Sequence, residues 1–376
     1  MVQMMHIALC SNFEVFKGDR LRDKQWSRRF PGSGWVTCLY QLGVESCVNI
    51  VSGDIAIENI KTHKWMAKEV LVIQDLTSQE AEYLLSMGAV PFMITCFESP
   101  IYEPNFYKYA DEISRKFKYK LGFSFVNDGV GIDKSDEVLE CKFPSYYRED
   151  MRDIRPWSTR KNIVAVAANK YRTNKIFRPK RLTFMAVARQ IKTIMWSLRS
   201  ASFKRALAES LHDQRLEALA FFAEQRNIDI YGKDWDNWGE LPNNLAKRFE
   251  EVIHSAYMGI CQDKLDLISN YRFTLCFENM VQPGYITEKI IDCFVAGTLP
   301  IYFGAPDIED YLPSNSYVDV RKFATYEQLR VFLSSMDEND ALDMIKAGRD
   351  YLKTDLGQMH SYEGFSLNIF RLIKTC

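Results

Sequence analysis

The segment FENMVQPGYITEKIIDCFVAGTLPIYFG, from Phe277 to Gly304, places a lysine where a helix is expected to begin. An apolar run ends at Glu278, a loop follows, and a helical pattern starts near Thr287, so Lys289 falls in the first turn. A helix N-terminus carries partial positive charge and disfavours a cation, yet it attracts phosphate. Spacing alone leaves two interpretations of Lys289 open: it binds an anion, or its ammonium group simply extends into water.

Two further polar residues end expected strands, where a parallel sheet binds ligands, and a third lies on an expected helix. Glu98 ends the apolar run PFMITCF, and Asn169 ends the run IVAVAAN. Ligands of α/β sheets bind at the carboxyl ends of the strands, so Glu98 is a candidate general base and Asn169 a candidate ligand. Arg215 lies in HDQRLEAL, on an expected helix over 211–225. The plainer alternatives are a capping or loop acid at Glu98 and a surface arginine at Arg215.

No metal or nucleophile motif accompanies these residues. The sequence contains neither a P-loop nor G-x-G-x-x-G nor G-x-S-x-G. The Asp-Trp-Asp at 234–236 is too short a signal for a divalent ion, and the five histidines show no paired spacing. The nine cysteines are scattered without a C-x-x-C pair, which indicates reduced, buried thiols. We therefore expect neither a metal site nor a cofactor.

The elements that must position these residues alternate between short apolar runs and helical patterns. Four apolar runs are typical of buried strands: HIALCS, SCVNIVS, EVLVIQD and PFMITCFESP. The segment between the last two, SQEAEYLLSMG, is typical of a helix that ends at Gly88. Residues 133–160 are charged and lack a period, and NIVAVAANK then opens a second alternating series. This pattern predicts two α/β domains with a cleft between them, over 1–150 and 151–350. We expect 351–376 to form a C-terminal helix that packs back on the first domain.

The bulk charge gives no sign of a nucleic-acid partner. The 376 residues carry a net charge of -1, so no field of the whole molecule attracts an anionic polymer. From Lys170 to Arg205, however, there are eleven basic residues, no acid, and interleaved apolar residues. This basic segment is either a helix that touches an anionic membrane or a solvated helix that covers the fold. The N-terminus lacks a signal-peptide pattern, so we expect a cytoplasmic protein. If the basic segment touches a membrane, the protein is peripheral on its inner face.

Several stretches together resemble one family. FTLCFENMVQPGYITEKIIDCFVAGTLPIYFGAP is similar to the donor-site signature of the α-1,3/1,4-fucosyltransferases of glycosyltransferase family 10, and CFESP resembles the ESP motif of the same family. RPWSTRKNIVAVAANK resembles the opening of the family's donor domain. QRLEALAFFAEQRNIDIYGKDW is similar to the arginine-bearing helix and strand of bacterial members. The match runs in the family's order from about residue 90 to 320, and residues 1–90 match only in their α/β pattern.

The resemblance implies a GT-B architecture of two Rossmann-like domains facing a central cleft. It implies GDP-β-L-fucose as the donor, with inversion at the anomeric carbon and no metal ion. By position in the motifs, Glu98 resembles the catalytic base, and Arg215 and Lys289 resemble the pair that neutralises the leaving diphosphate. The other implied donor contacts are Tyr285, Glu288, Asn279 and Asn169. The implied acceptor is a glycan, fucosylated in α-1,3 linkage on a GlcNAc-type residue.

One departure from the family pattern concerns the basic segment. Asn169 and Arg215 are 46 positions apart, whereas the corresponding residues of typical members lie close together, so 170–205 reads as an insertion. Two alternative functions stay open. One is a GT-B transferase that uses another nucleotide-sugar. The other is a non-catalytic protein that binds a sugar-nucleotide or a membrane surface.

Overall fold

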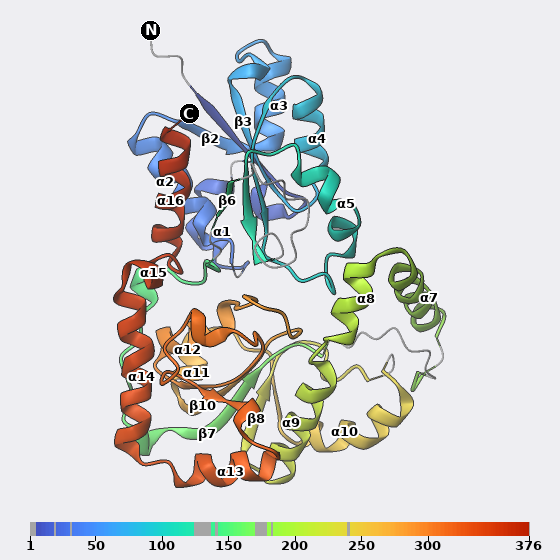
Figure 1. Cartoon of the computed structure of the whole chain (residues 1–376), viewed down its shortest axis with the longest axis vertical. Helices are drawn as coiled ribbons and strands as arrows, with labels where there is room; N and C mark the ends of the chain where they lie inside the picture. The colour runs from blue at the N-terminus through green and yellow to red at the C-terminus, as the bar shows by residue number, and fades with distance from the viewer. Residues whose placement is uncertain are drawn as a thin grey trace. The chain divides into compact units, whose positions relative to one another are not determined.

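The chain folds into two compact units, each built on its own parallel sheet (Figure 1). This computed structural model describes residues 5–18, 20–30, 32–123, 137–139, 142–169, 179–181, 183–238 and 241–375. Unit 1 consists of Met1–Glu98, Asn105–Glu149 and Thr354–Cys376, and unit 2 of Ser99–Pro104 and Asp150–Lys353. The C-terminal 23 residues thus belong to the unit that contains the first strand.

Unit 1 has a six-stranded sheet in the order β2-β1-β3-β4-β5-β6, with every pairing parallel. The strand order reverses direction between β1 and β3, which makes their carboxyl ends the expected ligand site. Strands β1 and β3 are buried along their whole length, as a sheet covered on both faces requires. The strands are β1 (His6–Cys10), β2 (Asn49–Ser52), β3 (Val70–Asp75), β4 (Val90–Cys96), β5 (Tyr119–Gly122) and β6 (Glu137–Leu139).

Helices cover both faces of this sheet. Apolar residues of α3, α4 and α5 form one cluster with alternate residues of β1, β3 and β4. On α2, Trp35 packs edge-on against Phe365 of α16, with ring centroids 5.5 Å apart, and the ring of Phe365 also meets that of Phe97. The helices of unit 1 are α1 (Lys24–Ser27), α2 (Gly34–Glu45), α3 (Gly53–Lys61), α4 (Gln79–Ser86), α5 (Pro104–Ser114), α15 (Asp355–Gln358) and α16 (Tyr362–Lys374).

Unit 2 repeats the arrangement with the order β12-β11-β10-β7-β8-β9, again all parallel. If β7 to β12 are numbered 1 to 6 and the sheet is read from the β9 edge, the strand order is the Rossmann order 3-2-1-4-5-6. The direction in which strands are added to the sheet reverses between β7 and β10. The prediction of two Rossmann-like domains is therefore confirmed. The strands are β7 (Lys161–Val166), β8 (Ile228–Tyr231), β9 (Tyr257–Gly259), β10 (Tyr271–Phe277), β11 (Leu299–Phe303) and β12 (Val318–Asp319).

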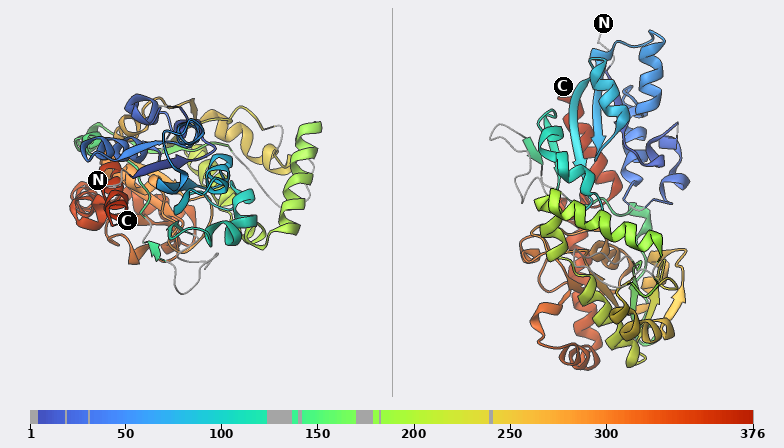
Figure 2. Two further views of the ribbon diagram at one scale, coloured as in Figure 1. Left: turned by 90° about the horizontal axis from the view of Figure 1, so that it is seen from above. Right: turned by 90° about the vertical axis from the view of Figure 1, so that its right-hand side faces the viewer.

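Helices α9, α11, α12 and α14 pack on the sheet of unit 2, whereas α7 lies at the outer edge of the unit (Figure 2). The core includes apolar residues of α9, α10, α13 and α14 with those of the central strands. The helices are α7 (Phe184–Arg199), α8 (Ala201–Ala208), α9 (His212–Glu224), α10 (Asn243–Ser255), α11 (Lys264–Ser269), α12 (Glu288–Ala296), α13 (Tyr326–Ser335) and α14 (Glu338–Lys353).

Two glycines fix the ends of elements near the candidate site. Gly297 ends α12 with φ 74°, as the sequence predicted for a helix stop. Gly232 follows β8 with φ 142°, and a Cβ atom there would lie 1.9 Å from the Ala167 carbonyl oxygen. Only glycine allows the chain after β8 to approach the end of β7 so closely.

The structure differs from the sequence-based expectations in two places. Residues 137–139 form an edge strand inside a segment where the sequence showed no regular pattern. A three-residue strand is too short to display an alternation of apolar and polar residues. The segment Ser99–Pro104 belongs to unit 2, although it lies within the stretch assigned to the first domain. Of the basic segment, residues 170–178 and 182 lie outside the described residues.

Candidate functional site

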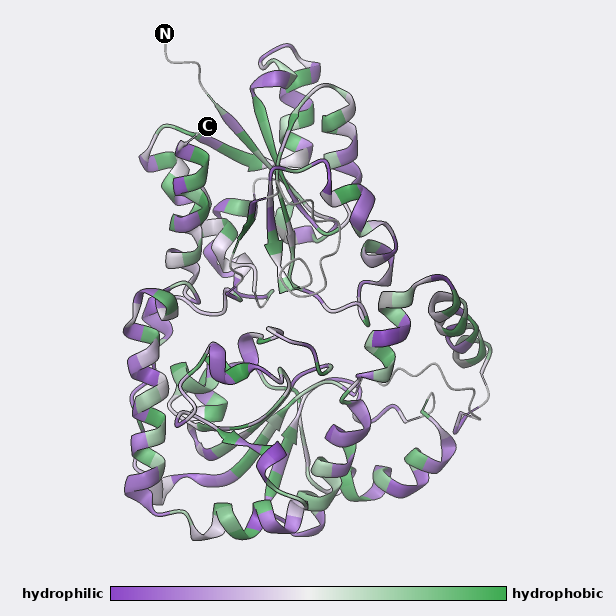
Figure 3. Cartoon of the chain, viewed as in Figure 1, coloured by the Kyte–Doolittle hydropathy of each residue, from purple (hydrophilic) through white to green (hydrophobic). Residues whose placement is uncertain are grey.

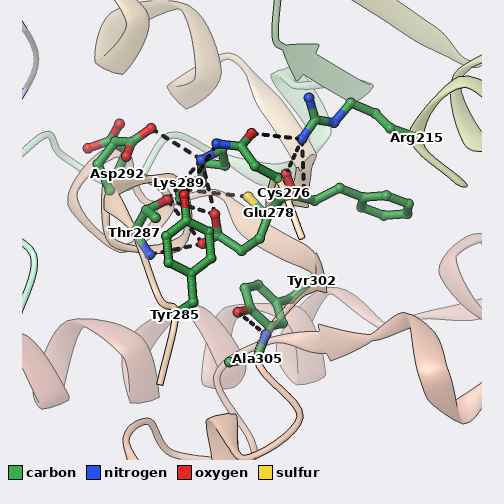
Figure 4. Close-up of polar contacts among 12 residues, drawn as sticks. Arg215, Cys276, Glu278, Tyr285, Thr287, Lys289, Asp292, Tyr302 and Ala305 are labelled. Atoms are coloured by element: carbon green, nitrogen blue, oxygen red, sulfur yellow. Dashed lines mark hydrogen bonds and ion pairs between the residues drawn. The ribbon is translucent and has the colours of Figure 1, made fainter. Parts of the chain in front are cut away.

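Lys289 is held by a buried carboxylate that the sequence analysis did not single out. Its ammonium group lies 3.0 Å from Glu278 Oε2 and 2.9 Å from Thr287 Oγ1 (Figure 4). The Glu278 side chain is 0% exposed and accepts a further bond from the Thr287 amide at 2.9 Å. An acid therefore occupies the start of α12, where the helix favours negative charge. The conflict posed by a lysine at this position is resolved inside the protein by Glu278.

A second acid and a second lysine extend this buried group. Glu288 lies 3.6 Å from the Lys289 ammonium, and Lys264 donates to Asp292 Oδ2 at 2.7 Å. Burial opposes the charge of Lys289, but Glu278 and Glu288 outweigh it and raise the pKa of the lysine above its ordinary value. Burial likewise opposes the charge of Glu288, but Lys289 and Lys264 lower its pKa to about 2. Both groups are therefore ionised at neutral pH.

Arg215 differs from the two lysines because its bonds go to neutral groups. Its Nη2 atom donates to the carbonyl oxygens of Phe277 and Glu278, each at 2.9 Å, and to Asn279 Oδ1 at 3.4 Å. The side chain reaches these atoms from α9, and it is buried. Burial lowers the pKa of Arg215, yet a guanidinium group stays protonated in proteins. Its full charge is therefore available to an anion at the end of β10.

The three cations line one small hollow at the point where the strand order of unit 2 reverses. Its walls come from the end of β7 (Ala165, Val166), from β10, and from Arg215, Lys264 and Lys289. The enclosed volume is about 20 Å³, room for about one water molecule. A hollow of this size with three cationic side chains suits an oxygen of an anionic group rather than a whole sugar.

The remaining donor candidates are divided between two places. Tyr285 is buried, and its hydroxyl accepts a bond from Asn279 Nδ2 at 3.3 Å, so both residues join the group around Arg215. Asn169 instead donates from its side chain to the Asp234 carbonyl at 3.3 Å and from its backbone to that of Lys233. These bonds tie Asn169 to the loop after β8.

The Asp-Trp-Asp stretch at 234–236 is explained by packing. Trp235 is buried and donates to the Ala167 carbonyl at 2.7 Å, while Asp234 and Asp236 on either side are exposed. Among the residues that the structure describes, no group of three or more His, Cys, Asp or Glu side chains lies close enough together to hold a metal ion.

Glu98 lies in unit 1, at the end of β4, where it borders an apolar hollow. The hollow has a volume of about 220 Å³, and its other walls include Asp75 at the end of β3 and the aromatic rings of Phe13, Trp35 and Phe143. The Tyr107 hydroxyl donates to the Glu98 carbonyl at 2.8 Å, which fixes the backbone of this residue. The site thus combines a half-buried carboxylate with an aromatic wall at the strand-order reversal of unit 1.

Sequence reasoning missed three members of the unit 2 group, Glu278, Lys264 and Asp292. Glu278 carried a usable signal, because it is the first charged residue after an apolar strand and lies eleven positions before the lysine that needed an anion. Lys264 carried none. It starts a six-residue helix, α11, and only the packing of α11 against α12 brings its ammonium group to Asp292.

We expect the ionisation of Glu288 to stabilise the folded chain at neutral pH. Its pKa falls from an ordinary 4.5 to about 2 on folding, so its contribution is present above pH 4.5 and is lost as the pH falls through 2. We expect Glu288→Gln to lower the free energy of unfolding by about 3 kcal/mol at pH 7, but by only about 1 kcal/mol at pH 3. Urea unfolding at the two pH values measures this difference.

The exposed ion pair of Glu309 with Lys322 provides the control. Glu309→Gln should change the free energy of unfolding by less than about 1 kcal/mol at either pH, because exposed pairs contribute little. An effect of Glu288→Gln that is equal at pH 7 and pH 3 would contradict the lowered pKa.

Two parallel Rossmann-like units, one with a cationic hollow at its strand-order reversal, have the architecture of the GT-B fold. The fold is shared by a glycosyltransferase from Rickettsia africae, with a TM-score of 0.56, 12% identity, and coverage of 100% of this chain and 99% of that one. Residues 192–344 match the family model "Glycosyltransferase family 10 (fucosyltransferase) C-term". Over these residues, which include Arg215, Lys264, Glu278 and Lys289, the chain is similar to glycosyltransferase family 10.

Two curated relatives agree with this assignment. GDP-fucose protein O-fucosyltransferase 3 of Xenopus laevis is 43% identical over 110 residues, 29% of this chain and 23% of that protein. Alpha-(1,3)-fucosyltransferase FucT of Helicobacter pylori is 33% identical over 117 residues, 30% of this chain and 24% of that protein. The chain thus spans about a quarter of the length of each of these relatives.

Proposed function

We propose that the chain transfers L-fucose from GDP-fucose to a hydroxyl group of an acceptor. The observation that carries this proposal is the cationic hollow inside a glycosyltransferase family 10 domain, at the carboxyl ends of β7 and β10. Such an edge is where an open α/β sheet binds nucleotides. The similarity to proteins named for GDP-fucose gives the donor.

The cations stabilise the leaving group. As the bond between the fucose C1 atom and the diphosphate oxygen breaks, negative charge grows on the diphosphate. Arg215 offers a guanidinium group bound only to neutral oxygens, while Lys289 and Lys264 are held in place by Glu278 and Asp292. Preformed cations need no rearrangement at the moment of reaction, which is what makes them effective. In this proposal they supply the charge that a divalent ion supplies in other transferases.

Glu98 acts as the general base of a single displacement. Its carboxylate takes the proton of the acceptor hydroxyl, the acceptor oxygen forms the new bond to C1, and GDP leaves from the opposite face. This sequence inverts the configuration at C1. The aromatic wall of the 220 Å³ hollow beside Glu98 suits the apolar face of a pyranose ring, so we assign the acceptor to this hollow.

Two classes of acceptor are candidates, a glycan and a protein. The relative from Helicobacter pylori is named for α-(1,3) transfer, which favours O3 of a GlcNAc-type residue in a glycan. The relative from Xenopus laevis is named as a protein O-fucosyltransferase and is the more similar of the two over its matched segment, which makes a protein hydroxyl the second candidate. Incubation with LacNAc-type oligosaccharides and with folded protein acceptors, followed by linkage analysis, separates the two.

We expect chelation to leave the reaction intact. With GDP-fucose and an accepted substrate, addition of EDTA should change the initial rate by less than about twofold, since Arg215, Lys264 and Lys289 supply the counter-charge. The measurement is GDP release with and without EDTA, and then with Mg²⁺ or Mn²⁺ restored. A rate that collapses with EDTA and returns with the metal would refute the metal-free mechanism.

A panel of nucleotide-sugars tests the donor and the two alternative functions. A ligand that binds only the folded state raises the melting temperature by mass action. We expect GDP-fucose and GDP to raise it, and UDP-sugars to have little effect. A larger shift with another nucleotide-sugar would favour a different donor. A shift with GDP-fucose without turnover on any acceptor would favour a non-catalytic binding protein.

A further inference from the structure

The surface helix α7 turns its apolar side outward. Phe184 is 86% exposed, Ile191 53% and Leu198 81%, and these residues recur at intervals of seven. A spacing of seven residues places side chains on one face of a helix. Thr193, about 180° around the helix from Phe184, is only 7% exposed. The side of the helix at Thr193 is therefore covered, whereas a row of apolar side chains faces solvent.

The row is continuous along the four turns of the helix. Val187 and Met195 belong to the same face and are 39% and 43% exposed. Figure 3 shows α7 as a largely hydrophobic helix at the outer edge of unit 2. A soluble domain normally buries such a face, so an exposed row of this length indicates that something else covers it. We call the five side chains of Phe184, Val187, Ile191, Met195 and Leu198 the apolar row.

Exposed basic residues lie on α7 and in the sequence on either side of it. Lys192 and Arg199 lie on α7 beside it, and both are exposed. Arg181 before the helix and Lys204 and Arg205 on α8 are exposed as well. From Lys170 to Ala208 the sequence contains no aspartate or glutamate. The surface that covers the apolar row must therefore be apolar inside and negatively charged at its rim.

We propose that α7 binds to the surface of an anionic lipid membrane, with the apolar row among the acyl chains and the surrounding cations at the headgroups. A nucleic acid would pair with the cations but leave the apolar row in water. A second copy of this chain would bury the row but bring like charges together around it. An anionic bilayer satisfies both features at once, and this inference does not depend on the proposed reaction.

The helix lies on the membrane rather than crossing it. With 16 residues, α7 is about 24 Å long, short of the roughly 30 Å of a hydrocarbon core. Among the residues that the structure describes, no helix has the length and apolar character needed to span a bilayer. Binding should therefore be reversible and sensitive to salt, because part of it is electrostatic.

Flotation of the full chain with lipid vesicles tests this proposal. We expect the wild-type chain to float with phosphatidylcholine vesicles that contain phosphatidylserine, and much less with phosphatidylcholine alone. The triple variant Phe184→Ser, Ile191→Ser, Leu198→Ser should reduce the bound fraction at least about tenfold. The double variant Lys192→Gln, Arg199→Gln should reduce binding several-fold and weaken its dependence on salt.

A matched control removes exposed apolar side chains from another part of unit 2. Met258, Ile260 and Val331 are 52%, 65% and 52% exposed, and their triple replacement by serine should leave vesicle binding unchanged. Equal binding to both kinds of vesicle, no binding by the wild-type chain, or equal loss in the control variant would each overturn the proposal. If the wild-type chain is a dimer that binds no vesicles, and the α7 triple variant is a monomer, then a second copy of the chain covers the apolar row instead.

Discussion

Replacement of Glu98 by glutamine is expected to reduce turnover by about 10²- to 10⁴-fold and to leave the affinity for GDP-fucose unchanged. The amide keeps the size of the side chain but cannot accept the proton of the acceptor hydroxyl. Donor binding is assigned to unit 2, whereas Glu98 lies in unit 1, so the two effects should separate. The measurement is kcat for transfer together with the Kd of GDP-fucose by calorimetry.

Glu112 provides the control for this substitution. It is an exposed carboxylate on α5 of the same unit, and Glu112→Gln should keep turnover within about twofold of the wild-type chain. A pH–rate profile adds a second criterion, because the glutamine variant should lose the limb that reports the general base. Turnover of Glu98→Gln close to that of Glu112→Gln would exclude Glu98 as the base.

Replacement of Lys289 by methionine should impair both folding stability and transfer. The Glu278 carboxylate is 0% exposed, and without its cation it becomes an uncompensated buried charge that costs about 3–5 kcal/mol. Transfer should fall by about 10²- to 10³-fold, because one of the cations that face the leaving diphosphate is gone. Urea unfolding measures the first effect, and steady-state kinetics below the unfolding temperature measures the second.

A second substitution separates these two effects. In the double variant Glu278→Gln, Lys289→Met the buried carboxylate is gone as well, so stability should largely recover while transfer stays low. Arg215→Ala should show the opposite balance to Lys289→Met, with a large loss of turnover and a smaller loss of stability, because the hydrogen bonds of Arg215 go to neutral oxygens and not to a buried carboxylate. Recovery of both stability and turnover in the double variant would make Lys289 a purely structural residue.

Much of the fold could be predicted from the sequence because its signals are local. Strands β1, β3, β4 and β10 coincide with predominantly apolar runs, and a strand covered on both faces requires such a run. The polar residues that end these runs, such as Glu98, were found for the same reason. The short edge strand β6 was missed, because three residues do not establish a period.

The candidate site was only partly predictable because its electrostatics come from residues distant in sequence. The motif around Lys289 indicated that an anion belonged beside this lysine, but only the end of β10 shows that Glu278 is its partner inside the protein. Whether Lys264 joins the site depends on how α11 packs against α12. Arg215 donates to neutral carbonyl oxygens because of the direction in which α9 approaches β10, and the sequence does not give this direction.

The sequence by itself determined the alternation of strands and helices, the residues at the strand ends, and the acid-free basic segment, since each of these is a property of neighbouring residues. Tertiary structure alone decided which charges are paired and which face of α7 is covered. The spacing of apolar residues shows that a helix has an apolar face, and this face is usually buried against the core. In α7 it is not, because the side at Thr193 is covered and Phe184 and Leu198 remain in solvent.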